Sequence, residues 1–193
     1  EVQVLNTLLA KQVDGIIYMG HKITDEMRAE FSRSKTPVVL AGTVDPDEQV
    51  GSVNIDYQAA TEKVITQLIA KGNKRVAFIT GSLLEPINGV YRLNGYKNAL
   101  KKAGIKFDES LIFESEYSYK AGEALWDKLA GAKATAAFVG DDELAIGVLN
   151  GAIDHGVKIP ANFEVITSNN SKLTEMVRPR LSTITQPLYD IGA

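Results

Sequence analysis

Strand-like and helix-like segments alternate along almost the whole of this 193-residue chain. Apolar runs typical of buried strands occur at 13–19, 37–41, 75–80, 135–139 and 164–167. In the stretches between them, apolar side chains recur every three or four positions, which is the period of an amphipathic helix. Strands that alternate with helices form parallel sheets covered on both faces. The sequence therefore predicts an α/β fold with doubly wound parallel sheets.

The expected helices have recognisable starts and ends. Thr24 and Asp56 are good N-caps because their side-chain oxygens accept hydrogen bonds from the first turn, and Gly72 ends the helix that Asp56 begins. The predicted helices cover 1–12, 24–34, 57–71, 89–103, 119–130 and 142–155, with a further helix starting in the last residues. Two short strands complete the pattern, near 111–113 and at 181–185.

Composition limits the classes of function. A hydrophobic content of 45% fills one large domain or two small ones, and a net charge of −3 excludes a surface that neutralises many DNA phosphates. The absence of cysteine excludes disulfides, thiolate nucleophiles and cysteine-based metal sites, and it is compatible with a reducing compartment. No apolar run approaches the roughly 20 residues that cross a bilayer. We expect a soluble protein that makes no membrane contact.

Catalytic and cofactor motifs are missing from the sequence. It has no phosphate-cradling loop, dinucleotide fingerprint, nucleophile elbow or helical zinc pair, so we expect neither an enzyme nor a bound cofactor or metal. The two histidines are far apart. His155 precedes a glycine at a helix C-terminus, where the helix dipole favours it, and His21 lies in a strand-to-helix loop, so we expect a structural role for both.

The acidic run Asp141, Asp142 and Glu143 has two interpretations. It could provide metal ligands, or it could cap the helix that follows and complement its dipole. The residues after it form one apolar face, made by Leu144, Ala145, Val148, Leu149 and Ala152. That face favours the capping interpretation.

Arg92, in the stretch "GVYRLNGYKNALKKAG", lies near the start of a predicted helix. It is expected on the flank of the core-facing stripe, which comprises Val90, Leu93, Tyr96, Leu100 and Ala103. It is either a solvated surface arginine or a ligand-binding residue, because ligands of open α/β sheets bind where helices follow the carboxyl ends of strands. Gly42, Tyr117, Asp141 and Asn169 also lie in loops after strands. Polar and aromatic groups gathered at this edge of the sheet suit the binding of a sugar or a sugar phosphate.

Seven ordered segments together carry a family resemblance: "VDGII", "NIDYQAA", "RVAFITG", "RLNGYKNAL", "AAFVGDDELAIGVLNGA", "VKIPANFEVI" and "RPRLSTITQPLYDIGA". The chain resembles the effector-binding core of the lactose-repressor and galactose-repressor family of bacterial transcription regulators over nearly its whole length. Within that family, "LEPING", "MVRPRLSTITQPLYDIGA" and "LLAKQVDGII" are similar to regulators of carbon catabolite control.

The resemblance implies a periplasmic-binding-protein-like fold of two doubly wound subdomains joined by crossing strands. Residues 1–54 with 187–193 would form an incomplete N-terminal subdomain, and 57–182 the C-terminal subdomain. The chain opens inside an apparent helix, so we expect a longer protein that adds a DNA-binding helix-turn-helix, a first strand and a C-terminal remainder. We also expect a cytoplasmic homodimer that reaches operator DNA through the domain missing here.

The resemblance also assigns roles to single residues. Arg92 matches the family's effector-contacting arginine, and Tyr117 falls where relatives place an aromatic that stacks on sugar. Asp141 stands at a position that is often asparagine, Asn169 where most members carry an aspartate, and Gly42 where some do. Fewer acids at 42 and 169 imply a less negative cleft, suited to a phosphorylated metabolite or to no tight effector.

Regulators of this branch respond mainly to a protein, the serine-phosphorylated histidine-containing phosphocarrier protein, which docks on the N-terminal subdomain. Tyr189 and Asp190 match positions in that interface; the residues alone are equally consistent with a helix start packed on its own sheet. The expected mechanism is allosteric. Two alternatives stay open: a periplasmic sugar-binding protein of the same fold, and an enzyme built on a doubly wound sheet.

Overall fold

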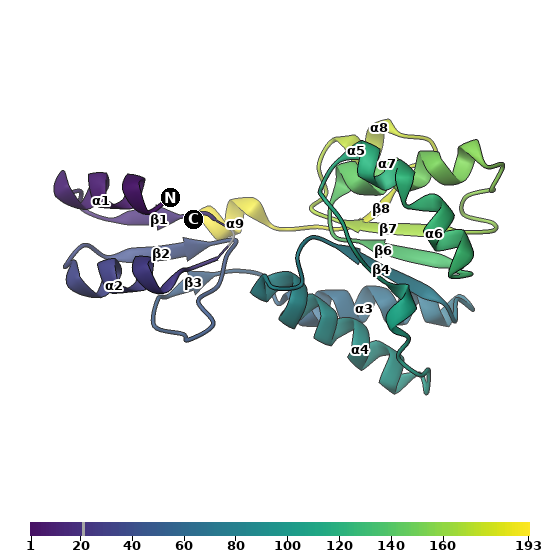
Figure 1. The fold of residues 1–193 in the computed structure, drawn as a ribbon, viewed down its shortest axis with the longest axis horizontal. Coiled ribbons are helices and arrows are strands. Elements are labelled where there is room, and N and C mark those ends of the chain that lie inside the picture. Colours follow the sequence, from purple (N-terminus) through teal and green to yellow (C-terminus); the bar gives the residue numbers. More distant parts are fainter. Residues whose placement is uncertain (21) are drawn as a thin grey trace. The chain divides into compact units, whose positions relative to one another are not determined.

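The computed structural model of the chain describes residues 1–20 and 22–193, and these divide into two compact units. Unit 1 comprises Glu1–Ile55 and Pro187–Ala193, and unit 2 comprises Asp56–Gln186. Each unit has its own parallel sheet (Figure 1), so the predicted α/β fold with two parallel-sheet subdomains is confirmed. His21 lies outside the described residues. No helix among the described residues is long and apolar enough to cross a membrane.

Unit 1 contains a three-stranded parallel sheet in the order β1-β2-β3. Its strands are β1 (Ile16–Tyr18), β2 (Val38–Ala41) and β3 (Ser52–Val53), and its helices are α1 (Val2–Ala10), α2 (Asp25–Arg33) and α9 (Leu188–Gly192). Leu5 of α1 and Met27 and Phe31 of α2 are buried with Ile16 and Leu40 of the sheet.

Side chains on the other face of this sheet are exposed. Because successive residues of a strand point to opposite faces, Ile17 is 75% exposed beside the buried Ile16, and Val39 and Val53 are 42% exposed. In the described part of unit 1, helices α1 and α2 therefore cover one face of the sheet and leave apolar side chains open on the other.

Unit 2 contains a five-stranded parallel sheet in the order β5-β4-β6-β7-β8. The strands are β4 (Val76–Thr80), β5 (Ile112–Glu114), β6 (Ala136–Val139), β7 (Glu164–Ser168) and β8 (Ser182–Ile184). The helices are α3 (Tyr57–Ala70), α4 (Leu93–Lys102), α5 (Tyr119–Ala124), α6 (Trp126–Gly131), α7 (Asp142–Asp154) and α8 (Leu173–Met176). A π-helical segment, Pro86–Arg92, precedes α4, and a 3-10 turn, Glu109–Leu111, precedes β5.

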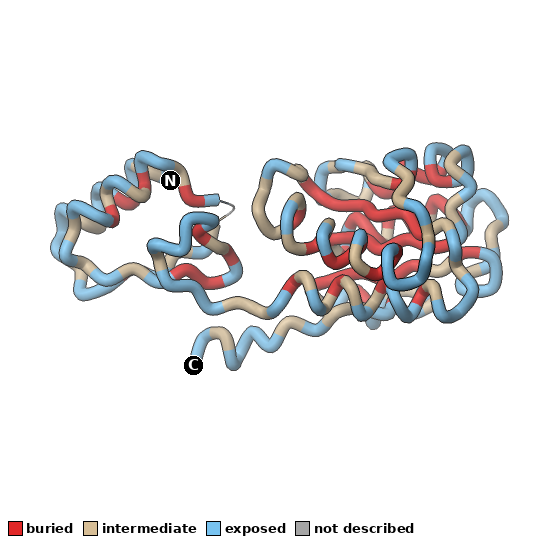
Figure 2. The backbone as a smooth tube through the Cα atoms, turned by 90° about the horizontal axis from the view of Figure 1, so that it is seen from below, coloured by how far each residue is buried: buried red, intermediate tan, exposed pale blue. Residues whose placement is uncertain are grey.

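The three central strands of the unit 2 sheet, β4, β6 and β7, are almost entirely buried, and Figure 2 shows long buried stretches of backbone in this unit. The edge strands β5 and β8 are half-buried or exposed. In β4, Val76 and Phe78 belong to the apolar cluster that includes side chains of α3 and α4. Ala77 and Ile79 belong to the opposite cluster, which includes side chains of α5, α6 and α7. This near-continuous apolar run is typical of a parallel strand with helices on both sides.

Helices α5 and α7 approach at the distance of backbone contact. A Cβ atom added to Gly147 would lie 2.1 Å from the Tyr119 carbonyl oxygen, and one added to Gly122 would lie 2.2 Å from the Leu144 oxygen. Both glycines are therefore required for this packing, which fixes α7 and the start of its first turn on the sheet.

The predicted helix caps are confirmed. The Thr24 side chain accepts from the Met27 amide at 3.2 Å, and Asp56 accepts from Ala59 at 2.8 Å. Asp141 caps α7, and the predicted apolar face of that helix is buried. The described residues contain no group of three acidic or histidine side chains able to hold a metal ion. His155 caps the C-terminus of α7, and its Nδ1 lies 2.7 Å from the Gly151 oxygen, so its structural role is confirmed.

The helix predicted over 89–103 differs at both ends from the helix in the structure. Its first part is π-helical, and the Leu93 amide donates to the carbonyl oxygen of Asn88, five residues back. The wider π turn rotates the side chains, so Val90 is 50% exposed, although we predicted it in the core stripe, and Arg92 is buried. Ala103, also predicted in the stripe, is exposed beyond the end of α4.

Two other helix predictions need correction. The segment 119–130 is not one helix, because it breaks at Leu125 into α5 and α6. On α3 the sequence pattern predicts a core-facing row of Ala60, Val64, Leu68 and Ile69. Of these, Leu68 is buried and the other three are half-buried, while the fully buried row is Tyr57, Thr61, Ile65 and Leu68.

Candidate functional site

Arg92 has a buried guanidinium beside the carboxyl ends of the strands in unit 2. The side chain is 6% exposed, so the interpretation as a solvated surface arginine is wrong. Its Nη2 donates to the Ser168 hydroxyl at 2.7 Å, and its Nη1 donates to Asn88 Oδ1 at 3.1 Å and to the Gly140 carbonyl oxygen at 3.2 Å. These contacts join the π-helical segment to the ends of β6 and β7.

The hydrogen-bond partners of Arg92 are all neutral. Within residues 1–20 and 22–193, no carboxylate forms an ion pair with this guanidinium, which also lies over the Tyr57 ring, with Cζ 5.5 Å from the centroid. Burial lowers the pKa of Arg92, while Tyr117, Tyr57 and Asp141 oppose that change. An arginine stays protonated in proteins, so a positive charge is buried here without a paired negative charge. An anionic ligand within hydrogen-bond distance of the guanidinium would supply the missing negative charge.

Tyr117 joins this arrangement through Asn88. Its hydroxyl donates to Asn88 Oδ1 at 3.2 Å and lies 3.4 Å from Thr80 Oγ1, while 39% of the side chain stays exposed. Asn88 Oδ1 thus accepts from both Arg92 and Tyr117. Gly81 makes room for the tyrosine ring, because a Cβ at that position would lie 3.0 Å from it.

Asp141 and Asn169 lie next to each other at the ends of β6 and β7. Asp141 Oδ1 accepts from the amides of Glu143 and Leu144 at 2.9 and 3.1 Å, and its Oδ2 accepts from Asn169 Nδ2 at 3.4 Å. Asn169 Oδ1 accepts from Gln186 Nε2 at 2.7 Å. A second carboxylate at position 169 would repel Asp141, so the amide fits this neighbour. The pair offers one carboxylate and one amide.

The loop that carries Asn169 is held in an unusual conformation. Asn169 has a φ of 112° and Asn170 has a φ of 57°, backbone angles that residues other than glycine rarely adopt. The buried Asp142 carboxylate fixes the loop, since it accepts from Thr167 Oγ1 at 2.9 Å and from the Ser171 amide at 2.7 Å. Asp142 is therefore a positioning residue for Asn169.

We refer to these side chains together as the Arg92 cluster, comprising Asn88, Arg92, Tyr117, Asp141, Ser168 and Asn169. Four of the predicted site residues belong to it: Arg92, Tyr117, Asp141 and Asn169. Sequence reasoning missed Asn88 and Ser168. Asn88 lies four residues before Arg92 on the same helical face, and Ser168 directly precedes Asn169. Their spacing from two predicted site residues is therefore a sequence signal that could have identified both. With guanidinium, hydroxyl, amide and carboxylate groups, the cluster can bind phosphate or sugar hydroxyls.

The other three predicted residues belong to unit 1. Gly42 follows β2 with a φ of 68°, a conformation that itself favours glycine. Tyr189 and Asp190 lie in α9, the helix predicted to start there. The Tyr189 side chain is 87% exposed and Asp190 is exposed as well, so neither packs on the sheet of its own unit in the described structure.

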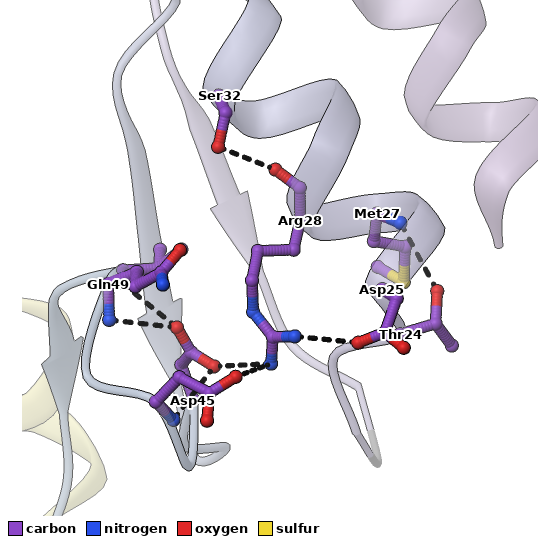
Figure 3. A network of polar contacts seen from close by, with 9 residues as sticks. Thr24, Asp25, Met27, Arg28, Ser32, Asp45 and Gln49 are labelled. Atoms are coloured by element: carbon purple, nitrogen blue, oxygen red, sulfur yellow. Dashed lines mark hydrogen bonds and ion pairs between the residues drawn. The ribbon is translucent and has the colours of Figure 1, made fainter.

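A second poorly exposed arginine, Arg28 of unit 1, shows the contrasting arrangement (Figure 3). Its guanidinium pairs with Asp25 at 2.8 Å, Asp45 at 2.8 Å and Asp47 at 3.0 Å. Asp45 also accepts from the Gln49 amide at 2.9 Å, which ties the loop after β2 to α2. This arginine is neutralised within the fold, whereas Arg92 is not.

Comparisons with known proteins agree with this fold. The family model of the periplasmic binding protein-like domain matches residues 65–193. Catabolite control protein A of Streptococcus mutans is 52% identical over 193 residues, which are 100% of this chain and 58% of the relative. The chain therefore spans little more than half the length of that relative.

Solved structures of transcription regulators have the same fold as this chain. The transcription regulator CcpA of Lactococcus lactis is 47% identical with a TM-score of 0.92, over 99% of this chain and 70% of that chain. A sugar-binding LacI-family regulator from Escherichia coli, solved in complex with phosphate, is 26% identical with a TM-score of 0.87, over 98% of this chain and 69% of that one. This chain belongs to the LacI family of transcription regulators, whose core is a periplasmic-binding-protein-like domain, and it is similar there to catabolite control protein A.

Proposed function

We propose that this chain is the effector-binding core of a DNA-binding regulator of carbon catabolite control, and that the Arg92 cluster receives a sugar phosphate. The observation that carries this proposal is the buried guanidinium of Arg92, whose partners among the described residues are neutral. A phosphate accepts charge-assisted hydrogen bonds from such a fork of donors. The E. coli relative that was solved with phosphate supports the same chemistry.

Other members of the cluster suit the sugar part of such a ligand. Asp141 and Asn169 present a carboxylate and an amide side by side, which together accept from and donate to hydroxyls. Tyr117 keeps 39% of its side chain exposed, enough for a ring face to contact a sugar. Gly42, in unit 1, adds no side chain, and we keep it as a predicted part of the site on the family resemblance.

The whole regulator would act by allostery in the cytoplasm. An effector that binds one of two conformations more tightly shifts their populations, typically with about 1–3 kcal/mol of coupling between sites. A homodimer would transmit the shift to DNA-binding domains, because paired half-sites of operators match two-fold protein symmetry. The regulators among the relatives support this role over that of a periplasmic sugar-binding protein.

The protein corepressor is the second part of the proposal. We assign docking of the serine-phosphorylated histidine-containing phosphocarrier protein to the surface around Tyr189 and Asp190. Both side chains are exposed on α9, as an interface residue of the free protein must be. Tyrosine is also one of the residue types enriched among the side chains that carry most of the binding energy of protein interfaces.

The Arg92 assignment is tested by isothermal titration of glucose 6-phosphate into the wild-type chain and two variants. Arg92→Ala removes the charge and all three hydrogen bonds, so we expect affinity to fall at least about tenfold. Arg92→Lys keeps the charge without the planar fork and should retain part of the affinity. Arg33→Ala, which removes a side chain that is 71% exposed, is the matched control.

Circular dichroism of each variant establishes that it is folded before titration. Glucose without the phosphate should bind more weakly than glucose 6-phosphate to the wild type. If Arg92→Ala folds and binds glucose 6-phosphate as tightly as the wild type does, the assigned role of Arg92 is wrong.

A further inference from the structure

Unit 2 has a cavity of about 520 Å³ at the amino end of its sheet. Lys74 lies just before β4, and the loop of residues 105–109 lies before β5; both contribute to its lining. The Arg92 cluster lies at the carboxyl end of the same strands. The four steps from Val76 to Thr80 along β4 separate the two places by roughly 13 Å, at about 3.3 Å per step, and no side chain belongs to both. The volume falls within the range typical of small-molecule sites.

The walls of this cavity are apolar and partly aromatic. Tyr96 and Leu100 of α4 are 0% and 3% exposed and form its closed side. Phe107 packs edge-on against Tyr96, with ring centroids 6.3 Å apart and an interplanar angle of 75°. Phe107 and Ile105 are only half-buried, so part of their apolar surface is open to the cavity. Such walls favour a flat apolar group.

The charged residues that line the cavity leave a positive balance. Arg75 pairs with Asp108 at 3.1 Å and donates twice to the Ala132 carbonyl oxygen, at 3.0 and 2.8 Å, so both members of this pair are satisfied. Lys74, Lys106 and Glu109 also line the cavity, and none of the three is in an ion pair with a described residue. Two ammonium groups and one carboxylate therefore remain.

One more positive charge lies beside the same wall. The Lys97 ammonium is 4.9 Å from the centroid of the Phe107 ring, in cation–π range. In a chain whose net charge is −3, this local excess of positive charge favours an anion.

We propose that the cavity is a second ligand site, for a small organic anion with a flat aromatic body. The aromatic body lies against Phe107, Ile105 and Leu100, and the anionic group lies near Lys74 and Lys106. The site is independent of the Arg92 cluster, so it binds its ligand whether or not a sugar phosphate is present.

The test uses 8-anilinonaphthalene-1-sulfonate, an aromatic sulfonate, as the probe. Titration into the ¹⁵N-labelled chain should shift amide resonances of residues 73–75 and 104–111 more than any others. Lys74→Glu with Lys106→Glu should weaken binding by roughly tenfold, because two attractive charges become repulsive. Lys63→Glu, the same change on an exposed lysine of α3 outside the cavity lining, should leave affinity unchanged.

Two further measurements sharpen the result. N-phenyl-1-naphthylamine, which has the same ring system without the sulfonate, should bind more weakly than the sulfonate does. Arg92→Ala should not change the affinity for the sulfonate, which separates this site from the proposed effector site. The proposal is overturned if the largest shifts fall in unit 1 or around residues 88–92, or if the double charge reversal binds the sulfonate as tightly as the wild type.

Discussion

Two poorly exposed arginines, the buried Arg92 and the half-buried Arg28, have opposite surroundings in this chain. Arg28 lies among three carboxylates, whereas Arg92 lies among a serine hydroxyl, an asparagine amide and a backbone carbonyl. The first holds a loop, and its charge is neutralised inside the fold. The second keeps a charge for which the described residues provide no ion pair. Residue type alone therefore does not distinguish the structural arginine from the one to which we assign ligand binding; the neighbouring groups do.

The structural role of the Arg28 network is tested at Asp45. Asp45→Asn should lower the free energy of unfolding by about 2 kcal/mol at pH 7, because a buried carboxylate loses its charge and part of its hydrogen bonding. Asp25→Asn is the matched control: its carboxylate pairs with the same arginine but is fully exposed, so its loss should cost little. Urea denaturation followed by circular dichroism measures both. Equal costs for the two variants would contradict this account.

The same carboxylate makes stability depend on pH. Burial by itself raises the pKa of Asp45, but hydrogen bonds from Arg28 and from the amides of Asp47 and Gln49 outweigh it, and the pKa is lowered. A lowered folded-state pKa contributes stability above the unfolded value of about 3.9, and this stability is lost as pH falls through the folded value. The difference in stability between wild type and Asp45→Asn should therefore shrink below about pH 4.

Among the helices and strands, the predicted N-caps are confirmed, since each depends on residues only a few positions apart. Thr24, Asp56 and Asp141 cap their helices as predicted, because the donors they satisfy lie two or three residues away. The π-helical segment before α4 was not predicted, since no local sequence pattern indicates that a helical turn contains one extra residue. That segment turns Arg92 inward and Val90 outward, so the site depends on the element that the sequence pattern did not reveal.

Helix α9 is the element to which we assign docking of the protein corepressor. In the full-length protein, Tyr189→Ala should weaken binding of the serine-phosphorylated phosphocarrier protein by about tenfold or more, as loss of an aromatic anchor does. Leu84→Ala removes an apolar side chain in unit 2 that is 92% exposed, and it should have no effect. Surface plasmon resonance measures both, with the unphosphorylated partner as reference. Unchanged affinity of the tyrosine variant would remove α9 from the interface.

For the whole molecule, the alternation of strands and helices predicted parallel sheets, and the family resemblance supplied their division into two subdomains. The assembly of the Arg92 cluster was harder to predict, because its contacts join distant parts of the chain. Arg92 reaches Gly140 across 48 positions and Ser168 across 76, and no spacing rule covers such pairs. The sequence therefore indicated the rim of the sheet and four of its residues, while the structure added Asn88 and Ser168 as the groups that join them.

Arg92 is the residue to which we assign anion binding in this regulator core. The most direct measurement is a crystal structure of the chain with glucose 6-phosphate bound. We expect phosphate oxygens within about 3 Å of the Arg92 guanidinium, replacing at least one of its present bonds to Asn88, Gly140 or Ser168. A ligand bound elsewhere, with those three hydrogen bonds unchanged, would contradict the claim.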